Sequence, residues 1–209
     1  MIAHSVSNRR SAASAETREQ ILEAAFRTLS GKGYESTTVK DIAEEAGVAQ
    51  GLVHYHFRSK QGLVLAVLAR CCAEMQLPDQ DDAIGTALEA FEHFKAMLRS
   101  GRDVNRLYIQ LIGVGLHDAE VGAGLLDDIR HNRGKVEAMA RGVLAERSLS
   151  PQVAPALAGA VWGGTLGIMV QAVVDPDFNA DAAVDALAAM AVALATHPEH
   201  LQGLGQDQP

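Results

Sequence analysis

The sequence is poor in aromatic residues and in cysteine. Only 4% of its 209 residues are aromatic, whereas 48% are apolar, and alanine and leucine are the most frequent of these. This composition favours helices over sheets. Cys71 and Cys72 are the two cysteines, and neighbours in sequence seldom form a disulfide with each other. The chain is therefore not a disulfide-stabilised scaffold, and we expect a cytoplasmic protein with reduced, partly buried thiols rather than a redox switch.

Long hydrophobic segments are also missing. No stretch is apolar over the length that a membrane span requires. Residues 1–13 are rich in Ser and Ala, and no apolar segment follows Arg9 and Arg10, so we expect neither a signal peptide nor an anchor. These thirteen residues are predicted to be a disordered tail.

The motifs of common enzyme and metal sites are absent as well. There is no Ser, His and Asp grouping for acyl transfer, no phosphate-binding loop, no HExxH segment and no cysteine pair at metal spacing. Asp128 and His131 form a single Asp-x-x-His, without the paired Glu-x-x-His segments of di-iron bundles. His93 and His117 are isolated. We therefore expect no catalytic site, no metal and no cofactor.

The most informative segment that is present covers residues 37–60, TTVKDIAEEAGVAQGLVHYHFRSK. Thr38 has the side chain of a helix N-cap, and Asp41 three residues later can complete a capping box. Gly47 ends this helix, because glycine adopts a left-handed conformation at little cost. Apolar side chains at helical spacing form the buried face of the helix: Val39, Ile42, Ala43 and Ala46.

A second short helix is expected over residues 49–57. Val48, Val53 and Phe57 would hold it against the first helix. Its outward positions carry amide, imidazole, phenol and apolar groups, which suit base edges and phosphates better than solvent: Gln50, Leu52, His54, Tyr55 and His56. Gly51 would permit close backbone approach. Two short helices joined by a glycine turn leave the second helix prominent, as is required for entry into a DNA major groove.

Ser59 and Lys60 begin a further helix and place a cap, backbone N–H groups and a cation where a phosphate could bind. Residues 15–76, and most densely residues 38–60, resemble the N-terminal domain of TetR-family transcriptional regulators. The resemblance is ungapped. Ala49 departs from it, because the family usually has serine or threonine there. This departure removes a cap or a phosphate contact that is typically worth about 1 kcal/mol.

The resemblance assigns DNA contacts to individual residues. Thr38 and Lys40 match positions that meet the DNA backbone, and Lys40 is also within reach of a base. Gln50, Gly51 and Leu52 match the leading positions of the recognition helix. Glutamine pairs with adenine and leucine packs on a thymine methyl, so we expect half-sites that contain A and T. The resemblance assigns phosphate contacts to four further residues: His54, Tyr55, His56 and Lys60.

Two alternatives remain for residues of this domain. The alternative for Tyr55 is partial packing against the first helix. The alternative to a disordered tail is an arm that binds in the DNA minor groove through Arg9 and Arg10.

The resemblance and the pattern together predict an all-α fold of about nine helices, with an N-terminal three-helix helix-turn-helix DNA-binding domain and a C-terminal helical bundle domain. The helices are expected at residues 15–30, 38–46, 49–57, 60–75, 80–99, 104–116, 119–146, 151–174 and 180–196. The expected domains are a tail over 1–13, a DNA-binding domain over 14–58, a connecting helix over 59–76, an effector-binding and dimerisation domain over 77–197 and a tail over 198–209. The apolar stripes predict a first core: Ile21, Leu22, Ala25, Phe26, Leu29, Tyr34, Leu63, Val64, Val67 and Leu68.

The net charge of −8 is unusual for a DNA-binding protein. Residues 1–60 carry eight basic and seven acidic side chains, so the acidic excess lies in the rest of the chain. Local basic groups determine phosphate affinity, so this distribution is compatible with sequence-specific binding and argues against indiscriminate coating of nucleic acid.

The last two helices predict a homodimer surface. Gly159, Gly163 and Gly167 recur every fourth residue, and a smooth helix face lets another helix approach closely. The following helix would contribute Ala183, Leu187, Met190 and Leu194. TetR-family proteins commonly dimerise through these helices, which would hold two recognition helices about 34 Å apart. Packing within one chain is the alternative.

An effector pocket is implied by the resemblance among the fifth to eighth helices. Its candidate lining is an apolar set with few polar groups: Phe91, Phe94, Met97, Tyr108, Leu111, His117, Trp162 and Met169. The predicted function is a ligand-responsive transcriptional repressor that a small apolar or amphipathic effector releases from a palindromic DNA operator. The alternatives are a DNA-binding protein without an effector and an enzyme built on a helical bundle.

Overall fold

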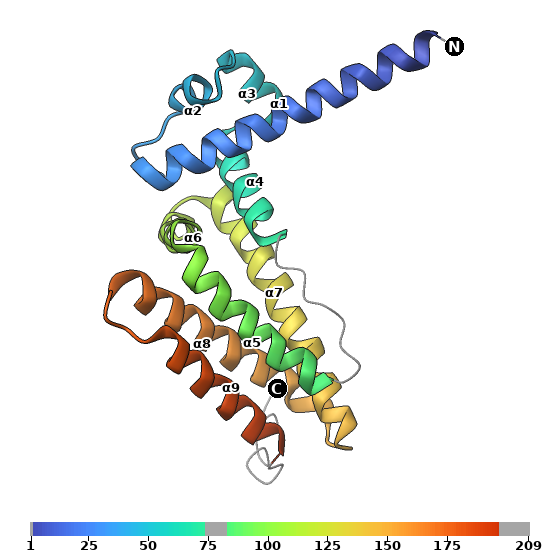
Figure 1. The fold of residues 1–209 in the computed structure, drawn as a ribbon, viewed down its shortest axis with the longest axis vertical. Coiled ribbons are helices and arrows are strands. Elements are labelled where there is room, and N and C mark those ends of the chain that lie inside the picture. Colours follow the sequence, from blue (N-terminus) through green and yellow to red (C-terminus); the bar gives the residue numbers. More distant parts are fainter. Residues whose placement is uncertain (1, 74–82, 197–209) are drawn as a thin grey trace. The chain divides into compact units, whose positions relative to one another are not determined.

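The computed structural model describes residues 2–73 and 83–196, and it describes no side chains at residues 2–11, 72–73 and 195–196. The described residues form nine α-helices, one 3-10 helix and no strand, which confirms the all-α prediction (Figure 1). The α-helices are α1 Ile2–Lys32, α2 Val39–Ala46, α3 Gln50–Phe57, α4 Lys60–Ala73, α5 Ala83–Ser100, α6 Arg102–Gly115, α7 Ala119–Glu146, α8 Ala154–Val174 and α9 Ala180–Thr196. The 3-10 helix η1 covers Pro151–Val153, directly before α8, and the Ser150 hydroxyl accepts a hydrogen bond from the N–H of Gln152 at its start.

The chain divides into two compact units. The first unit comprises Met1–Glu74 and Arg106–Leu125, and the second comprises Met75–Asn105 and Leu126–Pro209. The division falls within α6 and α7. The sequence predicted a DNA-binding domain over 14–58, a connecting helix over 59–76 and an effector-binding and dimerisation domain over 77–197, and this functional division stays a prediction. The predicted helix ends at residues 74–76 and 80–82 and the tail at 198–209 lie outside the described residues.

Helix α1 is longer than the sequence predicted. It begins at Ile2 instead of near residue 15, so helix covers most of the segment that was expected to be a disordered tail. Residues 1–30 contain neither glycine nor proline. Alanine and arginine are good helix formers, and without a breaking residue the helix continues toward the N-terminus.

The core of the first unit forms where α1 packs on α2, α3 and α4. The predicted apolar stripes of α1 and α4 are buried, with Phe26 only half-buried and Ala24 added to the core. Tyr34, in the loop after α1, is buried at 7% exposure, as predicted. The largest fully buried side chains of this unit are Ile21, Leu22, Leu29, Ile42, Val53, Leu63, Val64 and Val67, together with Leu107, Leu111 and Val121 of α6 and α7.

Residues 106–125 belong to the first unit because the beginning of α7 is fastened to α4. A Cβ atom at Gly124 would lie 2.5 Å from the methyl carbons of Leu65, so this glycine lets the leucine side chain approach α7 closely. Gln61 donates to Asp118 at 3.0 Å, and Ser59 donates to Glu120 at 3.0 Å. These contacts join residues about sixty positions apart, which local sequence patterns do not report.

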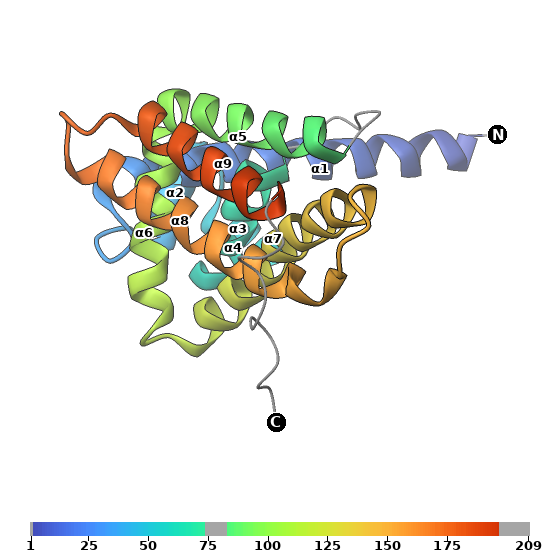
Figure 2. The ribbon, with the colours of Figure 1, turned by 90° about the horizontal axis from the view of Figure 1, so that it is seen from below.

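In the second unit α8 and α9 lie side by side, and α5 packs against α9 (Figures 1 and 2). The Lys95 residue of α5 is only 8% exposed, and its ammonium group lies 2.8 Å from Asp185 of α9 and 2.6 Å from Glu92. The hydrogen bonds to these two carboxylates raise the pKa of Lys95 above its ordinary value. Arg99, one turn after Lys95 in α5, pairs with Asp181, which lies one turn before Asp185 in α9. Two ion pairs therefore tie α5 to α9.

Helix α8 also corrects an expectation about hydrophobic length. Residues 151–174 form one helical stretch that is long and apolar enough to cross a membrane, with a mean hydropathy of 1.6. Only 22% of its most apolar window is buried within the chain. Helices that pack against a partner subunit share this length and composition, so the observation by itself identifies an apolar face and not its surroundings.

Candidate nucleic-acid interface

Helix α2 begins with the predicted capping box. The backbone N–H of Asp41 donates to the Thr38 hydroxyl at 3.1 Å, and the backbone N–H of Thr38 donates to the Asp41 carboxylate at 2.8 Å. The ammonium group of Lys32 lies 2.9 Å from the same carboxylate. The hydrogen bond from the Thr38 side chain, followed by that from Lys32, holds the pKa of Asp41 well below its usual range. The Thr38 hydroxyl therefore has a structural partner in addition to its predicted DNA contact.

The turn between α2 and α3 has the predicted geometry. Gly47 has φ of 66°, the left-handed conformation that glycine adopts readily, and its N–H caps the end of α2. Ala49 is the N-cap residue of α3 and makes no side-chain hydrogen bond there. The helix thus lacks the hydroxyl cap that serine or threonine would supply.

Helix α3 has one buried and one exposed face. Val53 and Phe57 are 2% and 7% exposed and hold the helix against the core. Gln50 and Gly51 are exposed at its start, and no atom lies within 4 Å of a Cβ atom placed at Gly51. Among the larger outward side chains, Leu52 is 42% exposed and Tyr55 is 75% exposed. At 75% exposure Tyr55 has little contact with the rest of the chain, which disfavours the alternative of partial packing against the first helix.

Two histidines of α3 have partners near the end of the helix. The Nδ1 atom of His54 lies 3.3 Å from the backbone oxygen of Arg58. A carbonyl oxygen only accepts, so Nδ1 carries the proton and Nε2 remains for an external partner. The half-buried ring of His56 lies against those of Tyr55 and Phe57, with centroids 5.1 and 6.1 Å away. His54 therefore offers one ring nitrogen outward.

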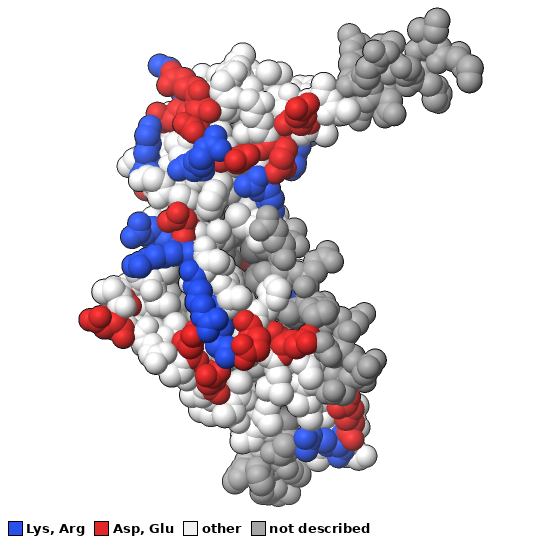
Figure 3. Space-filling view, viewed as in Figure 1, with Lys and Arg blue, Asp and Glu red and all other residues white. Residues whose placement is uncertain are grey.

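Basic and acidic side chains are interspersed on the face of the first unit that Figure 3 shows. Arg27 pairs with Glu23 and Glu45, at 3.0 and 2.9 Å. The ammonium group of Lys40 lies 3.7 Å from Glu44, and the lysine side chain is 74% exposed. An exposed pair of this kind is worth less than about 1 kcal/mol, so Lys40 can exchange its carboxylate partner for a phosphate at little cost.

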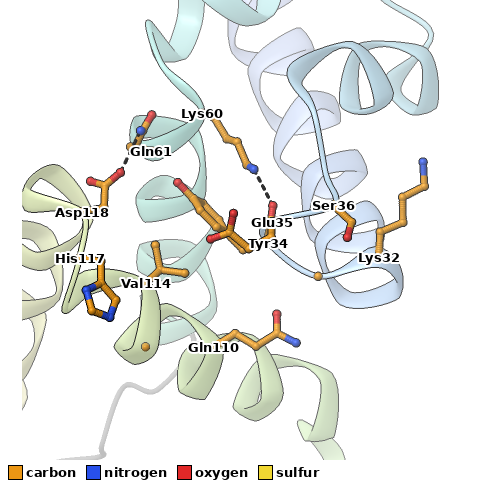
Figure 4. Close-up of a pocket in the computed structure, with 12 residues that line it drawn as sticks. Lys32, Tyr34, Glu35, Ser36, Lys60, Gln61, Gln110, Val114, His117 and Asp118 are labelled. Carbon is orange, nitrogen blue, oxygen red and sulfur yellow. Dashed lines mark hydrogen bonds between the residues drawn. The ribbon is translucent and has the colours of Figure 1, made fainter.

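Lys60 is directed inward, in contrast to its predicted role at a phosphate. Its ammonium group donates to the backbone oxygen of Tyr34 and lies 4.0 Å from the centre of the Tyr34 ring (Figure 4). The residue is half-buried, and burial lowers the pKa of Lys60. Contact with phosphate would require another side-chain conformation, and that contact stays a prediction.

An open groove of about 780 Å³ lies beside Lys60 within the first unit (Figure 4). Its walls are the loop after α1, the first turn of α4 and the end of α6 with the following turn. The side-chain oxygen of Gln110 is buried and has no hydrogen-bond partner among the described residues. His117, which was expected in an effector pocket, lines this groove and is exposed.

Arg58 is a residue of this surface that the sequence analysis missed. It is exposed and has φ of 63° and ψ of −51°, and the N–H of Ser59 donates to the oxygen of Phe57 at 2.7 Å. These values define a γ-turn, which is strained for a residue that has a Cβ atom. A Cβ atom at Gly62 would lie 2.6 Å from the Phe57 oxygen, so the turn also requires this glycine. A glycine in the first turn of an expected helix was the available signal.

The predicted effector-pocket residues are divided between the two units. Tyr108, Leu111 and His117 belong to the first unit, and the other five belong to the second. Tyr108, Leu111 and Met169 are buried. The residues that are half-buried are Phe91, Phe94, Met97 and Trp162. The indole N–H of Trp162 is itself buried and has no hydrogen-bond partner among the described residues.

The predicted dimer residues separate into two groups. Gly159, Gly163 and Gly167 are exposed, with no atom within 4 Å of a Cβ atom placed on any of them, and Met190 is 57% exposed. Ala183 is half-buried. The terminal carbons of Leu187 lie 2.9 and 3.0 Å from the Cβ position of Gly164, and Leu194 packs on the cluster of Leu144, Val153, Ala154 and Leu157. For Leu187 and Leu194 the alternative of packing within the chain therefore applies.

Sequence comparison places the helix-turn-helix in a known family. Residues 21–67 match the profile of the bacterial regulatory proteins, tetR family. The chain is 37% identical over 93 residues to the uncharacterized HTH-type transcriptional regulator YvkB of Bacillus subtilis (strain 168), covering 40% of this chain and 49% of that protein. It is 51% identical over 53 residues to the HTH-type transcriptional regulator TtgR of Pseudomonas putida, a quarter of each chain. These matches thus span half or less of the relatives.

A longer match extends beyond the helix-turn-helix. The HTH-type transcriptional regulator CymR of Pseudomonas putida is 29% identical over 172 residues, which cover 78% of this chain and 82% of that protein. These relatives are named as transcriptional regulators, the class that the sequence predicted in preference to an enzyme.

Solved structures show the same fold over most of the chain. Salmonella enterica GusR has a TM-score of 0.70 at 18% identity and covers 87% of this chain and 96% of its own. A TetR transcription regulator from Haloarcula marismortui ATCC 43049 has a TM-score of 0.73 at 17% identity. The match covers 87% of this chain and 97% of that one. The helix-turn-helix and the family match agree that residues 21–67 belong to the bacterial regulatory proteins of the tetR family, and the chain shares its fold with a solved TetR transcription regulator.

Proposed function

We propose that this chain is a sequence-specific DNA-binding transcriptional regulator of the cytoplasm, and that its regulatory mode is repression. The observation that carries the proposal is the division of α3 into two faces. Val53 and Phe57 are buried, while Leu52 and Tyr55 stay exposed beside Gln50. A short helix anchored in this way presents amide, apolar and phenol groups to a partner. These groups match the edges of A·T pairs and the adjoining phosphates in a major groove.

The operator is proposed to be palindromic because the regulator is proposed to be a homodimer. The exposed glycines of α8 and the exposed Met190 of α9 support an interface between two copies of these helices. A two-fold axis between the copies repeats the DNA site as two inverted half-sites. Their centres would be about 34 Å apart, one turn of DNA or a multiple of it.

The DNA-binding proposal is tested by selecting bound sequences from a random DNA pool and then measuring affinities for the enriched site. Gln50→Ala should weaken binding about 10- to 100-fold, because one good base contact is worth about 1–3 kcal/mol. Tyr55→Ala should also weaken binding, because it removes a contact to the DNA backbone. Gln152→Ala is the matched control, since Gln152 is exposed in η1 of the second unit. All three variants should keep the oligomeric state of the parent protein. Unchanged affinity in both α3 variants would reject the assignment.

A small apolar or amphipathic molecule is proposed as the effector, with a site in the second unit. The half-buried Phe91, Phe94 and Trp162 support an apolar ligand, and the unpartnered indole N–H of Trp162 supports a ligand with one hydrogen-bond acceptor. FadR from Bacillus subtilis, which shares the fold at a TM-score of 0.69 and 15% identity, has been solved in complex with stearoyl-CoA, an amphipathic molecule. Release from DNA then requires that the ligand bind one conformation better than the other.

The effector proposal can be tested with intrinsic fluorescence, because Trp162 is the only tryptophan of the chain. Fatty acids and aromatic carboxylates should be titrated into the protein, with and without operator DNA. A ligand that releases the operator should also change the Trp162 emission at the same concentration. Trp162→Phe should remove the signal and weaken the release. Release without any change at Trp162 would locate the site elsewhere, and failure of a broad ligand panel to release the operator would favour a regulator without an effector.

A further inference from the structure

Ser59 and the first two residues of α4, Lys60 and Gln61, have side-chain partners within the first unit, and Figure 4 shows the side chains of Lys60 and Gln61. Ser59 donates to Glu120 and Gln61 donates to Asp118, each at 3.0 Å, and Lys60 donates to the backbone oxygen of Tyr34. All of these residues belong to the first unit. The sequence predicted a phosphate-binding cradle at this place, but these side chains are used to join α4 to its neighbours.

The contact between Lys60 and Tyr34 has two components. The ammonium group donates a hydrogen bond to the Tyr34 carbonyl oxygen, and it lies 4.0 Å from the centre of the Tyr34 ring, well within the range of a cation–π interaction. Tyr34 is only 7% exposed, so its ring is held by the core. Moving Lys60 to a phosphate would break both interactions and uncover the ring.

Burial disfavours the charged form of Lys60 and lowers its pKa, whereas the nearby carboxylate of Glu35 acts in the opposite direction. Burial raises the pKa of Tyr34, and Asp118, Glu35 and Glu120 raise it further in that order. The negative potential that these carboxylates produce at the ring attracts a positive group. Lys60 is the cation that lies over the ring.

The contact between Lys60 and Tyr34 lies close in sequence to the recognition helix α3 and can therefore restrict its orientation. Tyr34 follows the end of α1 by two residues, and Lys60 is the first residue of α4. Only Arg58 and Ser59 separate α4 from α3, and Arg58 forms the strained γ-turn. A bond between Lys60 and the end of α1 therefore restricts the direction in which α3 leaves that turn.

We propose that Lys60 and Tyr34 form a clasp that positions α3 for DNA, and that Lys60 stays on Tyr34 when DNA is bound. This inference rests on the proposed DNA-binding function. Lys60 is then a positioning residue, and the phosphate contact belongs to exposed cations such as Lys40. The two roles differ in a measurable way. A lysine that contacts phosphate releases counterions, so removing it makes the slope of log K against log salt shallower by about 0.9, whereas removing a positioning lysine leaves the slope unchanged.

The test compares Lys60→Met with Lys40→Met on the selected operator over a series of salt concentrations. Methionine keeps most of the length of the side chain and removes the charge in both variants. Lys60→Met should lose about tenfold in affinity at every salt concentration, because a charged hydrogen bond and a cation–π contact are lost. Lys40→Met should lose affinity mainly at low salt and show the shallower slope. A shallower slope in Lys60→Met would overturn the proposal.

A second measurement follows the parent protein with and without DNA, and a variant serves only to assign the signal. The Tyr34 ring current should shift the NMR resonances of the Lys60 ε-methylene upfield, and Tyr34→Leu should return them to ordinary values. The upfield shift should persist when the operator is added. Loss of the shift on DNA binding would mean that Lys60 leaves the ring and would overturn the proposal. If the protein selects no DNA site at all, the proposed function fails and the positioning role fails with it, even where the shift demonstrates the contact.

Discussion

The two units of this protein expose opposite kinds of surface. In the first unit, α3 exposes Gln50, Leu52 and Tyr55 above a closed apolar core. In the second unit, α8 exposes glycines at every fourth position, and Val174 near its end is 74% exposed. The first surface offers separate chemical groups that can be matched to base pairs, and the second offers a smooth apolar face that suits another helix. The exposure of a surface therefore indicates the kind of partner it binds only when the chemistry of its exposed groups is considered.

Individual glycines of the two units differ in how closely they are confined. Gly62 and Gly124 of the first unit have atoms at 2.6 Å and 2.5 Å from a Cβ position, whereas Gly159, Gly163 and Gly167 of the second unit have none within 4 Å. Glycine therefore serves close packing within the chain in the first case. In the second case it leaves space that the described chain does not fill.

The largest effect is expected from Gly163→Arg, which would break the proposed use of the α8 surface. An unpaired charge in an apolar interface costs about 3 kcal/mol, so the dimer dissociation constant should rise roughly 100-fold. Sedimentation velocity over a dilution series measures this constant. Gly164→Ala is the control on the same helix, because its methyl group would meet Leu187 of the same chain and so affect stability rather than assembly. Equal dissociation constants for Gly163→Arg and the parent would remove the assembly role of this face.

The next largest effect concerns the tight packing of the first unit. Gly62→Ala places a methyl group against the backbone oxygen of Phe57, which cannot move without distorting the γ-turn, and should cost about 3 kcal/mol of unfolding free energy. Gly113→Ala in α6 of the same unit meets open space and should gain about 0.5–1 kcal/mol from helix propensity. Urea unfolding of both variants measures whether each substitution lowers or raises the free energy of unfolding. Similar stabilities for the two would mean that the confinement of Gly62 has no energetic consequence.

A smaller effect of opposite sign is expected at the uncapped start of α3. Ala49→Ser would supply a side-chain oxygen to the free N–H groups of the first turn and should add about 1 kcal/mol to the stability. Ala138→Ser, at an exposed position inside α7, lacks such free groups and should give no gain. Thermal melting of the two variants provides the comparison. A gain in both, or in neither, would contradict the assignment of Ala49 as an unsatisfied cap.

The smallest effect is a pH dependence in the capping box. Hydrogen bonds hold the pKa of Asp41 below its value in an unfolded chain, which is about 3.9. The stabilisation is therefore fully present at neutral pH and is lost as the pH falls below about 4 toward the folded pKa. Asp41→Asn should melt at a lower temperature than the parent at pH 7, and the gap should narrow as the pH falls toward 3. A gap that stays constant over this range would argue against the charged form as the stabilising species.

The sequence alone determined the local features of this fold. The capping box of Thr38 and Asp41, the left-handed Gly47 and the apolar stripes are properties of a few neighbouring residues, and the structure confirms them. The predicted bounds of 119–146 and 180–196 agree with α7 and α9. Such features are predictable because their free energy comes from groups within one or two helical turns.

Only the tertiary structure decided which partners the longer side chains use. Lys60 lies on Tyr34, Leu187 packs on Gly164, and Gln61 binds Asp118, although the sequence suggested a phosphate contact for the first and a dimer contact for the second. Tertiary packing also decided two other features, the γ-turn at Arg58 and the inclusion of residues 106–125 in the first unit. Each depends on groups that are far apart in the chain and are brought together by helix packing, so no local pattern encodes the outcome.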